Sequence, residues 1–356
     1  MDSSTFLYGG LGLLAATLGT AYTLLVLWSP NIIVPKPSEK TYRSARKPSA
    51  RLPLGSVGDS PSVDLTVVIP AYNETERLPS MFATTLAHLE STRSSRSYEV
   101  LVVDDGSRDG TADLALKLGA QYPQSEVRVV VLEKNVGKGG AVRHGMLHGR
   151  GRWLLMVDAD GASRFEDLEA LWKAMDEISP KGEPAVVVGS RAHLVKTEAV
   201  VKVRAVVVAV FCSSRRNVIL TDRSLPSSLS PQRSFIRNVL MYGLHTILRI
   251  VGVGHIRDTQ CGFKLFSRRA AQQIFPYQHL ATWIFDVEVL LLAKERGMAV
   301  AEVPIEWHEV SGSKLHVLAD SLQMLRDLII LRANLLLGRW KLPPAKAREN
   351  GNSKGR

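Results

Sequence analysis

Two aspartates one residue apart, Asp158 and Asp160, follow a short apolar run over residues 153–157. The run is long enough for one buried parallel strand and too short for a helix of ordinary length. A strand that ends in this way brings two carboxylates to a cleft, where Mg²⁺ or Mn²⁺ is typically held by one or two such groups with substrate phosphate and water. Because Asp-x-Asp alone is common, the alternative is a solvated turn in which Asp160 or Ser163 caps a helix over residues 166–176.

A second acidic pair, Asp104 and Asp105, follows another predicted strand. Carboxylates in this position accept hydrogen bonds from ribose hydroxyls or a base N–H, although a turn with a helix cap is the alternative. Lys138, in a glycine-rich segment, and Arg191 could balance the charge of a diphosphate. The sequence lacks a Walker P-loop ending and a Gly-x-Gly-x-x-Gly fingerprint at the first strand, which disfavours ATPase and dinucleotide-binding functions.

Strands and helices must alternate to bring these residues together. Apolar runs that predict strands are separated by helical patterns and cover residues 65–70, 98–103, 127–132, 153–157 and 185–188. This order predicts an α/β fold with a mostly parallel sheet. The polar residues come at the carboxyl ends of the strands, so one crevice along that edge should collect them.

The N-terminal part of the chain predicts a transmembrane helix. Residues 3–35 carry no charge, a length sufficient to cross about 30 Å of hydrocarbon. A cleavable signal peptide is the competing interpretation, but the first residues lack its positive region and the apolar stretch is too long. Residues 1–35 are therefore interpreted as an anchor. The basic residues that follow predict a cytosolic location for the rest of the chain, and residues 36–62, rich in Pro and Ser, are interpreted as a linker without a core of its own.

Composition sets further limits. The 356 residues have 45% hydrophobic content and a net charge of +11 that is concentrated in residues 36–51, residues 196–237 and the tail after Trp340. No stripe of Lys and Arg interleaved with aromatic residues occurs. The basic segments are therefore expected to contact anionic lipid headgroups and not nucleic acid. Cys212 and Cys261 have neither metal-ligand spacing nor a disulfide framework, which suits a reducing compartment.

Residues 315–340 predict an amphipathic helix. Leu322, Leu325 and Ile329 recur at three- and four-residue steps, and charged residues interrupt the apolar run. The pattern favours a helix at the membrane interface over a core helix, because the basic tail of residues 341–356 follows it.

The ordered motifs resemble the inverting nucleotide-sugar glycosyltransferases of family 2 and, among them, the branch that acts on polyprenyl phosphates. The motifs that carry this resemblance are residues 67–74, 102–111, 135–139, 157–162, 257–266, 283–288 and 302–307. The resemblance implies a GT-A type nucleotide-sugar-binding fold over residues 63–314. A segment over 195–231 departs from the family pattern as an insertion.

The resemblance also implies roles for individual residues. The uridine side of the donor pocket is matched by Pro70, Tyr72, Glu74, Asp104 and Asp105. Asp158 and Asp160 match the metal pair for Mg²⁺ or Mn²⁺, and Lys138 and Arg191 lie where the family handles the nucleotide-sugar. Asp258 matches the acceptor and sugar side, and Asp160 or Asp258 would act if a general base is needed. Lys264, Ser313 and Lys314 are the candidates for gripping a lipid phosphate.

The implied reaction is the transfer of glucose from UDP-glucose to dolichyl phosphate with inversion, for protein N-glycosylation. The implied location is the endoplasmic reticulum membrane, crossed once, with the catalytic domain in the cytosol. Mannosyl transfer from GDP-mannose and a catalytically impaired nucleotide-sugar-binding form remain as alternatives. The sequence does not indicate an oligomeric state.

Overall fold

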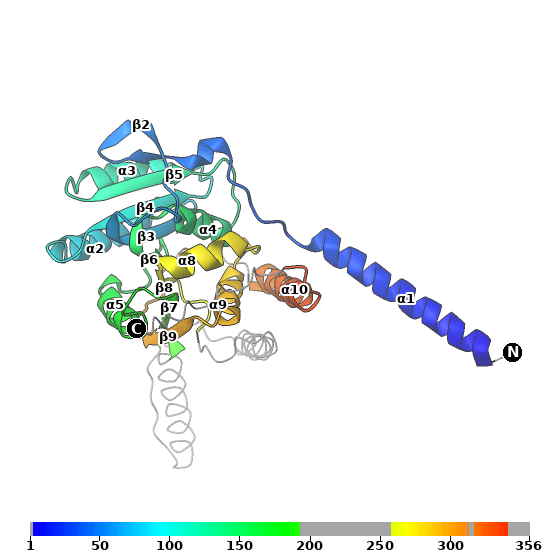
Figure 1. Ribbon diagram of the computed structural model, residues 1–356. Helices are drawn as coiled ribbons and strands as arrows, with labels where there is room; N and C mark the ends of the chain where they lie inside the picture. Colours follow the sequence, from blue (N-terminus) through cyan, green and yellow to red (C-terminus); the bar gives the residue numbers. More distant parts are fainter. Residues whose placement is uncertain (1–2, 193–257, 311, 313–316, 341–356) are drawn as a thin grey trace, which may run out of the picture.

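A computed structural model describes residues 3–192, 258–310, 312 and 317–340. Within these ranges the chain forms one nine-stranded sheet in the order β2-β1-β5-β4-β3-β6-β8-β7-β9, with helices on both faces (Figure 1). The predicted insertion over 195–231 and the basic tail over 341–356 lie outside the described residues.

Most of the sheet is parallel, as predicted. β3 pairs in parallel with β4 and β6, β4 with β5, and β7 with β9. The sequence did not reveal that β8 lies between β6 and β7 and runs antiparallel to both. The strands are β1 Thr41–Ser44, β2 Lys47–Pro53, β3 Val63–Ala71, β4 Tyr98–Asp104, β5 Glu126–Val131, β6 Gly151–Val157, β7 Ala185–Ser190, β8 Phe263–Ser267 and β9 Ala299–Pro304.

Two apolar layers cover the two faces of the sheet. Val67 and Ile69 of β3 are fully buried on one face and Val68 on the other, which explains why this strand is a continuous apolar run. The first layer contains α2 Leu78–Ser91, α3 Thr111–Ala120 and α5 Leu168–Ile178. The second contains α4 Lys138–His148, α8 Arg268–Ile274, α9 Phe285–Glu295 and part of α10 Val317–Leu336. Short 3₁₀ turns are η1 Pro37–Lys40, η2 Phe165–Asp167 and η3 Phe275–Tyr277.

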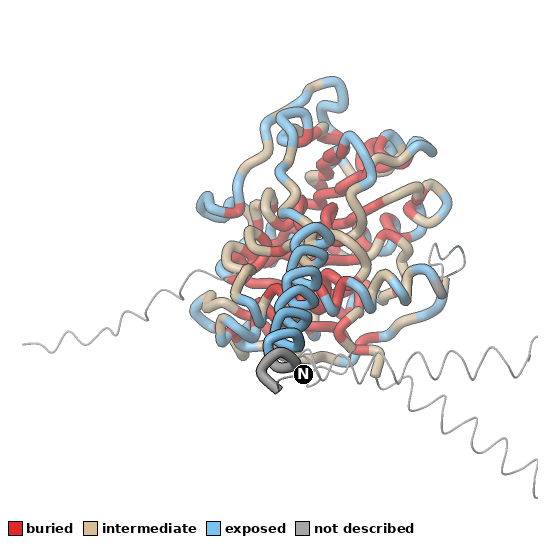
Figure 2. Tube along the Cα trace, turned by 90° about the vertical axis from the view of Figure 1, so that its right-hand side faces the viewer, coloured by how far each residue is buried: buried red, intermediate tan, exposed pale blue. Residues whose placement is uncertain are grey.

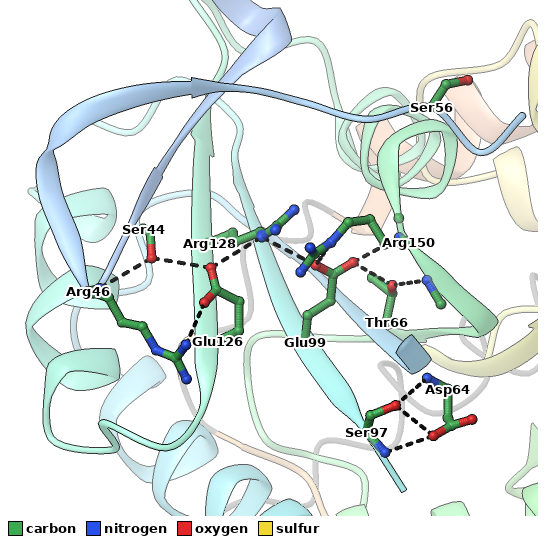
Figure 3. A network of polar contacts seen from close by, with 12 residues as sticks. Ser44, Arg46, Ser56, Asp64, Thr66, Ser97, Glu99, Glu126, Arg128 and Arg150 are labelled. Atoms are coloured by element: carbon green, nitrogen blue, oxygen red, sulfur yellow. Dashed lines mark hydrogen bonds and ion pairs between the residues drawn. The ribbon is translucent and has the colours of Figure 1, made fainter. Parts of the chain in front are cut away.

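The prediction of a linker over residues 36–62 is wrong. β1 and β2 form an antiparallel pair that extends the sheet beside β5, and the side chain of Tyr42 is buried there. Ser44 donates a hydrogen bond to Glu126 at 3.3 Å, and Arg46 forms an ion pair with the same carboxylate (Figure 3). The segment was missed because short edge strands often carry charged residues and Pro instead of an apolar run.

A buried carboxylate joins the starting ends of the parallel strands (Figure 3). Glu99 of β4 is 1% exposed and accepts hydrogen bonds from Thr66 Oγ1 at 2.7 Å and from Arg150 Nε at 2.8 Å. Arg128 Nε lies 3.3 Å from the same carboxylate. A charge that is removed from water needs such partners, so this network fixes β3, β4 and β5 at the edge opposite the strand ends that carry the sequence motifs.

The N-terminal helix α1, Ser3–Trp28, extends away from the domain (Figure 1), and residues 8–28 of it are exposed apart from the half-buried Leu25 (Figure 2). Within it, residues 8–28 are long and apolar enough to cross a membrane. Just after the helix, Ser29 Oγ accepts a hydrogen bond from Asn334 Nδ2 of α10 at 2.8 Å. The candidate span is therefore tied at its base to the C-terminal helix.

Helix α10 has two different faces. Leu328 and Leu331 are buried in the core, whereas Leu322 and Ile329 are 70% and 60% exposed. The apolar residues that the sequence pattern picked out therefore lie mainly on the outer face of the helix. The core contact comes from neighbouring leucines and from the buried polar residue Asn334.

Candidate active site

A cavity of about 600 Å³ lies at the carboxyl ends of β3, β4 and β6. It contains predicted site residues from several segments, which confirms that the parallel strands bring them to one edge. Those residues are Pro70, Tyr72, Glu74, Asp105, Lys138, Asp158 and Asp160. Further residues of the wall are Arg77, Asn135, Thr282, Trp283, Trp307, Glu309, Val310 and Gln323.

Asp158, directly after β6, is held by a lysine and by backbone. Lys138 Nζ lies 2.7 Å from Asp158 Oδ1 and 2.8 Å from Oδ2. The backbone N–H of Asp158 donates to the carbonyl of Gly262 at 3.1 Å, and a Cβ on Gly262 would stand 1.9 Å from Asp158 Oδ2. The carboxylate is therefore packed against a glycine that cannot be replaced without displacing it.

Asp160 lies in the same wall. Its Oδ1 accepts a hydrogen bond from the backbone N–H of Ala162 at 3.0 Å, and its Oδ2 lies 4.0 Å from Arg77. Burial raises the pKa of Asp160, and the negative charge of Asp158 raises it further. Arg77 also donates to Glu74 at 2.7 Å, so Glu74 positions a cation that faces the acidic pair.

The pair fits a hard divalent cation. Asp158 Oδ1 is buried and receives no hydrogen bond of ordinary geometry, although it faces the lysine ammonium. Among the described residues no group of three or more His, Cys, Asp or Glu could hold a metal. Two carboxylates with an open cavity beside them match the usual site of Mg²⁺, in which phosphate and water complete the coordination.

The two carboxylates after β4 have different surroundings. Asp105 lines the cavity and accepts hydrogen bonds from the backbone N–H groups of Val136 at 2.7 Å and Gly137 at 2.9 Å. Burial raises its pKa to about 6 despite these bonds. Asp104 is buried behind it and accepts from the N–H of Ser107, so it shapes the turn and is not among the residues that line the cavity.

The glycine-rich segment before α4 packs closely against residue 281. Gly137 has a φ of 93°, and a Cβ there would lie 2.5 Å from the Ala281 carbonyl oxygen. That oxygen already accepts hydrogen bonds from the N–H groups of Gly139 and Gly140. The first amides of α4 are thus engaged with protein, and Lys138 is the charged residue that this segment contributes to the cavity wall.

Arg191 and Asp258 form a pair of their own. Arg191 Nε lies 2.7 Å from Asp258 Oδ2, and its Nη2 lies 2.9 Å from Oδ1. Burial alone would raise the pKa of Asp258, but the guanidinium outweighs it and the pKa is lowered. Neither residue is among those that line the cavity. A carboxylate engaged in this way is a poor general base, so the geometry disfavours that role for Asp258.

The prediction that Lys264 grips a lipid phosphate is wrong for this structure. Lys264 lies in β8 and its side chain is fully buried. Its Nζ is 2.6 Å from Asp286 Oδ1. The sequence could not reveal this because the antiparallel position of β8 between β6 and β7 was not predicted. Ser313 and Lys314 lie outside the described residues.

Several wall residues were not given a role from the sequence. Arg77 belongs to no quoted motif, and only its spacing of three residues from Glu74 hints at the pairing. Trp283 and Trp307 lie within two motifs of the family resemblance, 283–288 and 302–307. These motifs point to the two residues, but the sequence indicates no role for them. Gln323 comes from α10, and no sequence pattern indicates that this helix reaches the cavity.

Residues 66–275 match Glycosyl transferase family 2. The dolichyl-phosphate beta-glucosyltransferase of Saccharomyces cerevisiae is 41% identical over 343 residues, which cover 92% of this chain and 93% of that protein. The chain belongs to the dolichyl-phosphate β-glucosyltransferases of glycosyl transferase family 2. The member of this family from Homo sapiens is also 41% identical, over 85% of each chain.

Family membership and the sheet agree on the fold. The mostly parallel sheet with its cavity at the strand ends is the GT-A-like α/β fold that the sequence predicts. Among solved structures, glucosyl-3-phosphoglycerate synthase from Mycobacterium tuberculosis in complex with Mn²⁺ and UDP-glucose is similar with a TM-score of 0.47 and 16% identity. That similarity covers 80% of this chain and 81% of the other.

Proposed function

We propose that this chain transfers glucose from UDP-glucose to dolichyl phosphate, with inversion at the anomeric carbon. The observation that carries the proposal is the meeting of Asp158, Asp160, Asp105 and Lys138 in one cavity of about 600 Å³. The cavity is of the size usual for a small-molecule site. The relatives from Saccharomyces cerevisiae and Homo sapiens are both named dolichyl-phosphate beta-glucosyltransferase. Each is 41% identical to this chain over most of its length.

The donor would lie along the ends of β3 and β4. Asp105 offers a carboxylate to the ribose or base, and Pro70 and Tyr72 form the adjoining wall. Asp104 is buried behind this wall and accepts a hydrogen bond from the N–H of Ser107 at 2.9 Å, which stabilises the turn after β4. The diphosphate would then extend toward Lys138 and the acidic pair, where positive charge is needed.

Asp158 and Asp160 are the residues that would hold Mg²⁺ or Mn²⁺. Such an ion would neutralise the charge of the departing uridine diphosphate. The protein itself supplies the remaining positive charge through Lys138, whose pKa is raised. Burial would lower that pKa, but the carboxylates of Asp158 and Asp286 outweigh it and keep the ammonium charged.

The acceptor needs little activation. A phosphate monoester has a second pKa near 6, so its oxygen is already nucleophilic at neutral pH. In a single displacement this oxygen attacks the anomeric carbon as the bond to the diphosphate breaks, and an α-linked donor gives a β-linked product. The site therefore has to position the two substrates and stabilise charge, and it does not require a general base.

The acceptor would enter from the side of α10. Trp283, Val310 and Gln323 line this part of the cavity, and Thr282 donates a hydrogen bond to Asp327 of α10 at 2.7 Å. The exposed leucines of α10 lie on the same helix and suit contact with hydrocarbon. A lipid phosphate could then reach the cavity while its chain stays in the bilayer.

The bond between Ser29 and Asn334 supports the proposed membrane arrangement. Because the candidate span ends at this bond, α10 would lie at the membrane surface where the span leaves it (Figure 1). The basic residues that follow the span favour the cytosolic side. On this basis we propose a single span, with residues 315–340 as an interfacial helix and the oligomeric state open. The endoplasmic reticulum as the membrane is what the resemblance to the dolichyl-phosphate β-glucosyltransferases implies.

The transfer assay tests the proposal. Membranes that contain the full chain are given dolichyl phosphate and labelled UDP-glucose or GDP-mannose, and label entering the organic phase is counted. Transfer from UDP-glucose alone is expected. Transfer from GDP-mannose alone would move the chain to mannosyl transfer, and donor binding without transfer would indicate an impaired form.

A further inference from the structure

Two ion pairs lie near one another, one at the cavity and one in the core. Asp158 lies at the cavity and pairs with Lys138, and Lys264 pairs with Asp286 at 2.6 Å in the interior. Asp286 is also one of the carboxylates whose charge raises the pKa of Lys138. Lys138 thus lies under the influence of Asp158 and Asp160 at the cavity and of Asp286 in the core.

The ion pair of Lys264 and Asp286 is almost completely buried. Lys264 has no exposed surface and Asp286 is 2% exposed. Lys264 also donates to the carbonyl of Cys261, whose neighbour Gly262 packs against Asp158. Replacing such a pair by apolar side chains often leaves stability unchanged or improved, so stability alone does not explain its presence.

Lys138 is itself a cation in direct contact with Asp158. Its ammonium lies within 2.8 Å of both carboxylate oxygens, which is the position a metal ion would need. A divalent cation therefore cannot bind Asp158 fully unless Lys138 moves away. An ammonium that leaves one carboxylate inside a protein needs another negative group nearby.

We propose that Lys138 is an exchangeable counter-ion of the acidic pair and that Asp286, held by Lys264, is the positioning residue that stabilises Lys138 when it releases Asp158. This inference rests on the proposed use of Asp158 and Asp160 as metal ligands. Lys138 would suppress metal binding in the empty cavity. When a donor arrives, the diphosphate and Asp286 together hold the released ammonium.

Mn²⁺ binding to the full chain in detergent, without nucleotide, tests the proposal by electron paramagnetic resonance of the free ion. Lys138→Met should bind Mn²⁺ at least about tenfold more tightly than the wild type, because the competing charge is gone. Lys134→Met is the matched control, since it removes the same charge from an exposed position of the same segment. An affinity in Lys138→Met equal to or weaker than that of the wild type would overturn the proposal.

Asp286→Asn should weaken Mn²⁺ binding several-fold, because Lys138 then has only the cavity carboxylates as partners. If this variant does not fold, Lys264→Met/Asp286→Leu replaces the pair with apolar side chains and should weaken Mn²⁺ binding in the same way. A well-folded double variant with wild-type Mn²⁺ affinity would mean that the pair is only structural and would overturn the role of Asp286. In Lys138→Met, further loss of Mn²⁺ binding on Asp160→Asn tests the metal site separately from the exchange.

Discussion

Gly262 and Asp158 are in such close contact that a Cβ on the glycine would stand 1.9 Å from the carboxylate oxygen Oδ2. The two residues come from segments about a hundred positions apart, and the N–H of Asp158 donates to the carbonyl of Gly262. The first carboxylate of the acidic pair is therefore positioned by a glycine that the sequence alone marks only as part of a motif.

Gly262→Ala should lower kcat/KM for glucosyl transfer by about a hundredfold, because a shift on the order of 1 Å at a reacting group has an effect of this size. Transfer kinetics with UDP-glucose and dolichyl phosphate measure the loss. Gly55→Ala is the control, since a Cβ there makes only an ordinary contact at 3.4 Å. Equal activity of the two variants would contradict the tight packing at Asp158.

Donor binding should weaken as the pH falls through about 6, the raised pKa of Asp105. The protonated carboxyl is a poorer acceptor for the N–H groups of Val136 and Gly137 and for the donor. The dissociation constant of UDP-glucose, measured between pH 5 and 8 without acceptor, should rise toward acid in the wild type. Asp105→Asn should show weaker binding that no longer follows this titration.

The same pKa has the opposite effect on folding. A carboxyl whose pKa is raised from 3.8 to about 6 contributes stability that is present below pH 3.8 and is lost as the pH rises through 6. Acid would thus favour this part of the fold while it disfavours donor binding. If the affinity for UDP-glucose were the same at pH 5 and pH 8, Asp105 would not contact the donor.

The outer face of α10 should affect the lipid acceptor and not the donor. Leu322→Glu/Ile329→Glu places two charges where apolar side chains are exposed, and the KM for dolichyl phosphate in bilayers should rise about tenfold. The dissociation constant of UDP-glucose should stay unchanged. Lys117→Gln/Lys173→Gln changes the net charge equally at exposed positions of α3 and α5 and should have neither effect. An unchanged KM for the acceptor in the α10 variant would argue against membrane contact there.

Glu99→Gln should lower the free energy of unfolding by about 3 kcal/mol, because Arg128 and Arg150 lose a buried partner. Denaturant unfolding of the detergent-solubilised chain measures this change. The network lies at the opposite edge of the sheet from the cavity, so the folded variant should keep the wild-type KM for UDP-glucose. A changed KM at unaltered stability would mean that the network acts on the site.

The strand order around the site could be predicted only in part. Continuous apolar runs identify β3, β4, β5, β6 and β7, since buried parallel strands have that pattern. The short charged strands β1 and β2 have no such pattern, and β8 lies beside β6 through contacts distant in sequence. The sequence therefore predicted five of the parallel strands. It did not predict β1 and β2 at one edge, β9 at the other edge, or β8 between β6 and β7.

The residues of the candidate site could also be predicted only in part. Asp105, Asp158 and Asp160 follow strands, so the topology alone brings them to one edge. Lys264 was misassigned because its burial depends on β8, and the pairing of Arg191 with Asp258 depends on two segments that only the fold brings together. Local pattern predicts what each strand end carries, whereas tertiary contacts decide which charges remain available.

The most direct test of the central claim is glucosyl transfer by Asp158→Asn and Asp160→Asn variants of the full chain in membranes, with and without chelator. The wild type should transfer glucose from UDP-glucose to dolichyl phosphate, and chelator should abolish the transfer. Each variant should lose at least about a hundredfold in rate while remaining folded. Wild-type rates in either variant, or transfer that is insensitive to chelator, would contradict the assignment of the cavity as a metal-assisted glucosyl transfer site.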